Sequence, residues 1–84
     1  MAVAPPRTVF DVITDFLATN PTPETILAYR LPVELEQRAL QLLEIQRAEG
    51  LSRDEELEML DFIRADDMMT LLKTKTRLKL SGKA

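Results

Sequence analysis

The chain has 84 residues, of which 45% are hydrophobic and 30% are charged, and its formal net charge is −3; this length fits one domain. The absence of cysteine and histidine excludes disulfides and thiolate chemistry, and it removes the commonest metal ligand and the usual general base near neutral pH. We therefore expect no enzyme, no metal site and no cofactor.

The first predicted element is a helix from Thr8 to about Thr19. Residues 1–7 combine small side chains with two prolines and are expected to be disordered. Thr8 can accept a hydrogen bond from the helix N-terminus, and Asn20-Pro21 ends the helix. One face is apolar at helical spacing and should pack in the core: Val9, Val12, Ile13, Phe16 and Leu17.

A second, shorter helix is predicted from Thr22. Threonine as the cap, Pro23 in the first turn and Glu24 at the positive end of the helix dipole are typical of a helix start. Pro32 disfavours helical geometry at the residue before it, so this helix must end early. Its candidate buried residues are Ile26, Leu27 and Tyr29.

Two longer helices joined by a short turn follow. Pro32 suits the first position of the third helix, and Gly50 lies where that helix should end in a left-handed residue. Ser52 and Glu55 have the spacing of a capping box at the start of the fourth helix. So short a connection predicts antiparallel packing. The predicted fold class is all-α, a small helical bundle centred on an antiparallel helical hairpin, with residues 8–72 as a single domain.

This hairpin has a predicted register. Counting outward from the turn, the contacts expected between the two helices are Leu43 with Leu60, Ala39 with Ile63, and Leu35 with Met68. Truncation of Leu43 or Leu60 to alanine is then expected to cost roughly 2–5 kcal/mol.

The fourth helix, which should continue to at least Leu72, is apolar on two sides. One side carries Leu57, Leu60, Ala65, Met68, Leu71 and Leu72, and much of the other carries Met59, Phe62, Ile63 and Met69. Such a helix is either central in a bundle or shared with a partner. Methionine serves both as core filler and as an adaptable contact at binding surfaces. We interpret the second side as a partner-binding surface, which predicts self-association, with a dimer as the expected state.

Charge is distributed unevenly along the chain. Between residues 34 and 67, eleven acidic side chains stand against four arginines. The segment 73–84 is a basic tail without acidic residues, and its bases are Lys73, Lys75, Arg77, Lys79 and Lys83. Its alternating pattern fits an extended strand, and its position fits the end of the fourth helix. The first four of these bases join the predicted partner-binding residues.

Two other kinds of site fit the sequence less well. Asp66 and Asp67 are adjacent and point about 100° apart on a helix, so they cannot share a metal ion unaided. The turn before Ser52 resembles that of a helix-turn-helix, but the following helix opens with acidic residues that DNA phosphates would repel. The basic tail is the better candidate for nucleic acid, although no aromatic residue lies in it to stack on bases.

No stretch of the sequence indicates a membrane or an export signal. The apolar runs are much shorter than the ~18–20 residues that cross a bilayer. Residues 1–6 lack the basic and then apolar pattern of a signal peptide. We expect a cytoplasmic protein without membrane association.

Several segments are similar to a group of small helical proteins found in bacteria, particularly cyanobacteria. The matching residues are Ile26-Leu27, Arg30-Leu31-Pro32, Glu34-Leu35, Leu42-Leu43, Arg47, Gly50-Leu51-Ser52, Glu55 and Leu71-Leu72-Lys73. The resemblance covers Thr22 to Leu80, and the chain departs from it at Phe62, where tyrosine is usual, and at Thr74, where alanine is usual. Members look like the first gene of a two-gene unit whose second product is a nuclease-type toxin. The resemblance implies an antitoxin-like role and assigns no catalytic residue.

The sequence therefore predicts a non-enzymatic protein–protein interaction module of antitoxin-like character. It would bind itself, a dedicated partner protein such as a toxin encoded by the adjacent gene, or both, through the fourth helix and the basic tail. Two alternatives stay open. One is a nucleic-acid-binding accessory protein that uses the tail, and the other is a structural subunit of a larger assembly.

Overall fold

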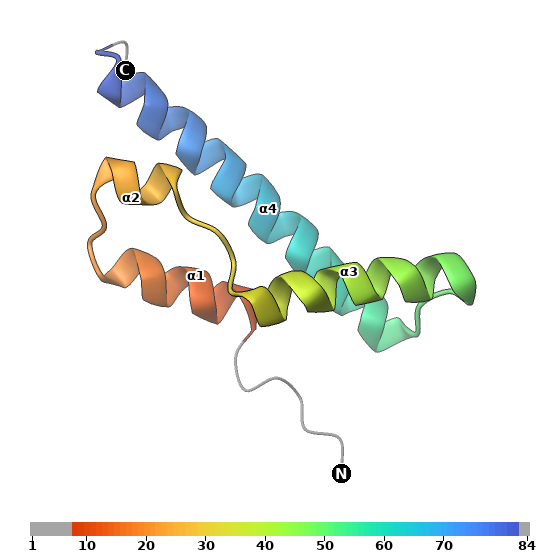
Figure 1. Ribbon diagram of the computed structural model, residues 1–84. Coiled ribbons are helices and arrows are strands. Elements are labelled where there is room, and N and C mark those ends of the chain that lie inside the picture. The colour runs from red at the N-terminus through yellow and green to blue at the C-terminus, as the bar shows by residue number, and fades with distance from the viewer. Residues whose placement is uncertain (1–7, 83–84) are drawn as a thin grey trace.

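The computed structural model describes residues 8–82, and these form four helices and no strand. The helices are α1 (Val9–Ala18), α2 (Pro23–Leu27), α3 (Val33–Ala48) and α4 (Arg53–Leu80). Figure 1 shows α4 as a long diagonal rod, with α1 and α2 along one side of it and α3 crossing its N-terminal part. The predicted all-α class is confirmed. The predicted disorder of residues 1–7 falls outside the described residues.

Capping residues fix the helix boundaries, as the sequence predicts. Thr8 and Asp11 form a capping box at the start of α1, and Ser52 and Glu55 form another at the start of α4. Gly50 follows the end of α3 with φ at +85°. A side chain at that position would be strained by the left-handed backbone, which is the reason a glycine suits it.

Two helix boundaries were not given correctly or completely by the sequence, and the structure defines them. Pro32 is the N-cap of α3, so the helix begins one residue later than predicted. Residues 73–80 continue α4 as a helix, and the strand alternative is wrong. Thr76 is 7% exposed, and its hydroxyl donates to the carbonyl of Leu72 at 2.7 Å. A helical backbone brings Lys73 and Thr76 to one face, which lets this segment pack against the rest of the fold.

The core lies between α1 and the middle of α4. Val9 and Ile13 of α1 pack with Ala65 and Met69 of α4, and each is 8% exposed or less. The partly buried residues around them are Phe10, Leu17, Tyr29, Leu31, Phe62 and Leu72. The predicted apolar face of α1 is therefore confirmed, and it is α1 rather than α3 that covers the centre of α4.

Two contacts hold the segment after α2 in place. The rings of Phe16 and Tyr29 stack with their centroids 4.2 Å apart. The ammonium group of Lys73 donates a hydrogen bond to the backbone carbonyl of Tyr29 at 2.8 Å. These contacts tie α1, α2 and the C-terminal third of α4 into one unit.

The contact between α3 and α4 is less extensive than the sequence predicts. Leu42 is fully buried and Leu35 is 8% exposed. The other residues of the predicted pairs are more exposed to solvent. Leu43 is 46% exposed, Leu60 is 36% exposed and Met68 is 39% exposed. The pairs Leu43–Leu60 and Leu35–Met68 are therefore not buried contacts. Because α3 crosses α4 obliquely (Figure 1), the two helices diverge instead of packing side by side along their length.

Candidate interaction surface

An apolar groove opens between α3 and α4. Its volume is about 320 Å³, and it is lined by Leu31, Ala39, Leu43, Met59, Phe62, Ile63 and Asp66. A second hollow of about 490 Å³ at the helix turn shares Met59 and Ile63 with the first. The rest of its lining consists of Gln46, Gly50, Leu51, Glu56 and Leu60. We call the residues of the first hollow the hairpin groove. The oblique crossing creates it, because apolar side chains on both helices are left uncovered on the open side.

The structure brings together three of the four apolar residues predicted to bind a partner. Met59, Phe62 and Ile63 all line the hairpin groove, and Ile63 is 51% exposed. Ala39 and Ile63, a predicted contact pair, line it from opposite helices. Met69 requires a correction, because it is 8% exposed and belongs to the core. It lies one helical turn after Ala65, on the face that α1 covers.

A second apolar surface runs along α4 away from the core. We call it the outer stripe, and it consists of Leu57 (53% exposed), Leu60 (36%), Met68 (39%), Leu71 (56%) and Leu78 (44%). The sequence pattern groups most of these residues with Ala65 and Leu72 on one side of the helix. In the structure, only Ala65 and Leu72 of that side pack against the core cluster, because α1 and α2 approach α4 from a direction that the pattern alone does not specify.

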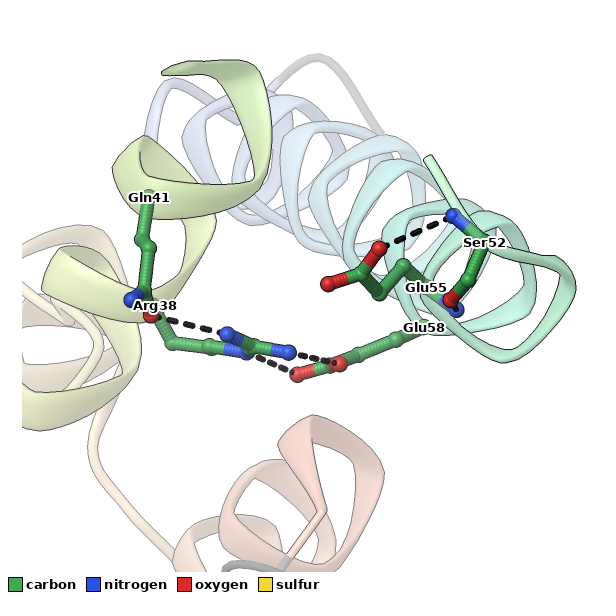
Figure 2. A network of polar contacts seen from close by, with 5 residues as sticks. All are labelled: Arg38, Gln41, Ser52, Glu55 and Glu58. Carbon is green, nitrogen blue, oxygen red and sulfur yellow. Dashed lines mark hydrogen bonds and ion pairs between the residues drawn. The ribbon is translucent and has the colours of Figure 1, made fainter. Parts of the chain in front are cut away.

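A bidentate ion pair joins α3 to α4 beside these surfaces. The guanidinium of Arg38 donates two hydrogen bonds of 2.7 Å to the carboxylate of Glu58, and a third of 2.7 Å to the side-chain oxygen of Gln41. Figure 2 shows this reach from α3 across to α4. The hydrogen bonds to Glu58 raise the pKa of Arg38 above its ordinary value. The sequence analysis missed this pair, because the two residues are far apart in the chain and fit ordinary solvent-facing positions.

The capping carboxylate at the start of α4 also titrates abnormally. The backbone N–H of Ser52 donates to Glu55 at 2.8 Å, as drawn in Figure 2. This hydrogen bond is the main reason that the pKa of Glu55 is lowered, and the hydroxyl of Ser52 adds to the effect. Glu55 therefore stays ionised at the positive end of the helix dipole, where a negative charge is favourable.

The predicted basic residues separate into two groups. Lys73 is half-buried and donates a hydrogen bond to the carbonyl of Tyr29, so it has a structural role within the chain, and its partner-binding role stays a prediction. Lys75, Arg77 and Lys79 are exposed on the last turns of α4. None of the three forms a hydrogen bond through its side chain, or an ion pair, with another residue of the described range 8–82.

The remaining polar side chains include several that line a third hollow near α2. A hollow of about 230 Å³ near α2 is lined in part by Arg30, Glu36, Asp66 and Lys73, and Arg30 pairs with Glu36 at 3.2 Å. Among residues 8–82, no group of three or more acidic side chains could hold a metal ion. In the same range, no helix has the length and apolar character needed to cross a membrane.

Comparison of the chain with known protein families, with curated proteins and with solved structures finds no match. The resemblance to the cyanobacterial group therefore stays a prediction based on the residues quoted above.

Proposed function

We propose that this chain is a non-enzymatic protein–protein interaction module whose hairpin groove receives part of a partner protein. The observation that carries the proposal is the apolar lining of the groove, with Ile63 and Leu43 about half exposed. An exposed apolar surface bordered by polar groups is characteristic of a protein-binding site. The groove also combines residues from two helices, so its shape depends on the fold.

Charge indicates the chemistry of that partner. Asp66 and Glu56 border the groove and the adjoining hollow, and the chain from residue 34 to residue 67 carries eleven acidic side chains against four arginines. A partner that presents apolar side chains flanked by lysine or arginine would complement this surface. Proteins that act on nucleic acids are commonly basic where they bind phosphates. An antitoxin-like role, in which the acidic module covers a basic nuclease, is consistent with that chemistry.

The test is affinity capture with a matched pair of variants. The intact chain is tagged and expressed in its native host, and the retained protein is identified, purified and titrated against the chain. We expect one stoichiometric, basic partner, whose binding is lost in the double variant Met59→Gln/Ile63→Gln and kept in Leu40→Gln. Leu40 is 62% exposed and lies on α3 outside the groove. Unchanged binding by the groove variant would contradict the proposal.

A nucleic-acid-binding role is the second candidate, and the exposed Lys75, Arg77 and Lys79 favour it. Phosphate contacts make affinity fall steeply with salt. If this role is correct, the full chain binds single-stranded or duplex nucleic acid at low salt. The triple variant Lys75→Gln/Arg77→Gln/Lys79→Gln then loses binding, whereas the groove variant keeps it.

A further inference from the structure

We propose that the outer stripe pairs with the outer stripe of a second copy, with the two α4 helices antiparallel. This inference goes beyond the proposed function, because it uses a different surface and does not require the hairpin groove to bind anything. Its basis is the combination of an exposed apolar stripe with a charge pattern that a second copy in this orientation neutralises.

The apolar part of the argument is the spacing of the stripe. Leu57, Leu60, Met68, Leu71 and Leu78 recur at intervals that keep them on one side of α4, where Arg64 and Lys75 lie between them. The C-terminal turns of α4 extend past the other helices in Figure 1. Apolar residues that recur along one side of a helix can form a seam with a second helix, and the charged residues among them then decide the orientation of the pair.

The charge part of the argument is the separation of signs along one rigid helix. Acidic residues such as Asp54, Glu56 and Asp61 outnumber Arg53 and Arg64 in the N-terminal half of α4. The last turns carry Lys75, Arg77 and Lys79. Asp61 and Lys75 are about 21 Å apart along the axis at 1.5 Å per residue. Salt screens exposed charges beyond roughly 8 Å at physiological ionic strength, so the two ends of one helix cannot neutralise each other.

An antiparallel second copy removes this separation. When Leu57 of one copy faces Leu78 of the other, the two Met68 side chains meet near the symmetry axis. The same register brings Asp61 of each copy opposite Lys75 of the other. A parallel pair would instead place acid against acid and base against base, which is unfavourable. The arrangement is isologous, so it closes as a dimer.

The first experiment measures the mass of the full chain in solution by sedimentation equilibrium over a range of concentrations. We expect a dimer whose dissociation constant rises at least ~10-fold in Leu71→Gln, since this residue lies one helical turn from the symmetry axis and is 56% exposed in one copy. Leu40→Gln, a matched change on α3, leaves the constant unchanged, and so does Met59→Gln/Ile63→Gln. A monomer at all concentrations, or a dimer that Leu71→Gln leaves intact, would overturn the inference without affecting the groove proposal.

The second experiment tests orientation. The chain has no cysteine, so single cysteines report contacts cleanly. We expect Met68→Cys to cross-link with itself, and Glu56→Cys to cross-link only when mixed with Lys79→Cys. Self-linking of Glu56→Cys would indicate a parallel pair and overturn the proposed orientation.

Charge reversal gives an independent check on the same orientation. Lys75→Glu is expected to weaken the dimer, and the added change Asp61→Lys in the same chain is expected to restore it. If the double variant does not regain dimer affinity, these two positions do not face each other across the dimer.

Discussion

Different interactions stabilise the two ends of this molecule. At the core end, α1 and α2 cover α4 through buried apolar side chains such as Ile13 and Met69. At the hairpin end, α3 is joined to α4 by the buried Leu42, a bidentate ion pair and a capped turn. The core end therefore depends on burial, and the hairpin end depends more on polar geometry. Apolar surface is therefore left available for a partner at the hairpin end.

Two adjacent methionines offer the sharpest test of the comparison. Met69 is 8% exposed in the core, whereas Met68 is 39% exposed on the outer stripe. Met69→Ala should lower the free energy of unfolding by about 2–5 kcal/mol, since it leaves a cavity. Met68→Ala should lower it by less than about 1 kcal/mol. Urea denaturation at a concentration where the chain is monomeric measures both, and equal losses would break the comparison.

The capped turn should contribute less to the free energy of unfolding than the buried Met69 does. Ser52 accepts a hydrogen bond from the N–H of Glu55 at 3.2 Å, and Ser52→Ala is expected to cost about 1 kcal/mol in thermal or urea unfolding. Ser81→Ala, at the other end of the same helix, is the control, because Ser81 donates to a carbonyl that water can also satisfy. A larger loss at Ser81 than at Ser52 would show that the turn does not stabilise the hairpin.

The ion pair at the hairpin end should contribute as much to the free energy of unfolding as the Ser52 cap, or less. A double-mutant cycle with Arg38→Gln and Glu58→Gln isolates it, and we expect a coupling of roughly 0.5–1 kcal/mol. The bidentate geometry at 2.7 Å places it near the upper end of the range for partly exposed pairs. The coupling should decline with added salt, whereas the loss in Met69→Ala should not. A coupling of zero would leave Leu42 as the main link between α3 and α4.

Acid should weaken the hairpin end through Glu55. Its pKa is lower in the folded state than its ordinary value of 4.5. The carboxylate therefore stabilises the fold fully above pH 4.5, and this contribution is lost as the pH falls through the lowered folded value. Glu55→Gln keeps a capping side chain without the titration, so its free energy of unfolding should fall less steeply below pH 4.5. Parallel pH curves for the two proteins would contradict this assignment.

Local signals in the sequence were sufficient for much of the fold. Each of these signals depends on residues that are close in the sequence. Examples are the capping residue Ser52, the left-handed position of Gly50 and the apolar face of α1. The direction from which α1 approaches α4 is a property of the whole fold. For that reason the sequence pattern placed Met69 outside and Met68 inside, which is the reverse of the structure.

The candidate surface was predictable to a similar extent. The excess of apolar positions on α4 is visible in the sequence, and Met59, Phe62 and Ile63 do line one groove. The contribution of Leu31 depends on the oblique crossing of α3, which no spacing rule specifies, whereas Ala39 and Ile63 were already paired in the predicted register. The role of Lys73 was hidden for the same reason, because its partner is a backbone carbonyl distant in the chain.

The position of the core also has a consequence for synthesis. Val9 and Ile13 belong to the first helix, and Ala65 and Met69, which complete their cluster, belong to the last. A ribosome must therefore release most of the chain before α1 can be buried. During that interval the hairpin can form, because its contacts join residues that are near in the sequence. The apolar face of α1 stays exposed to solvent. Slow translation of α4 would prolong that exposure and favour capture of the nascent chain by a chaperone.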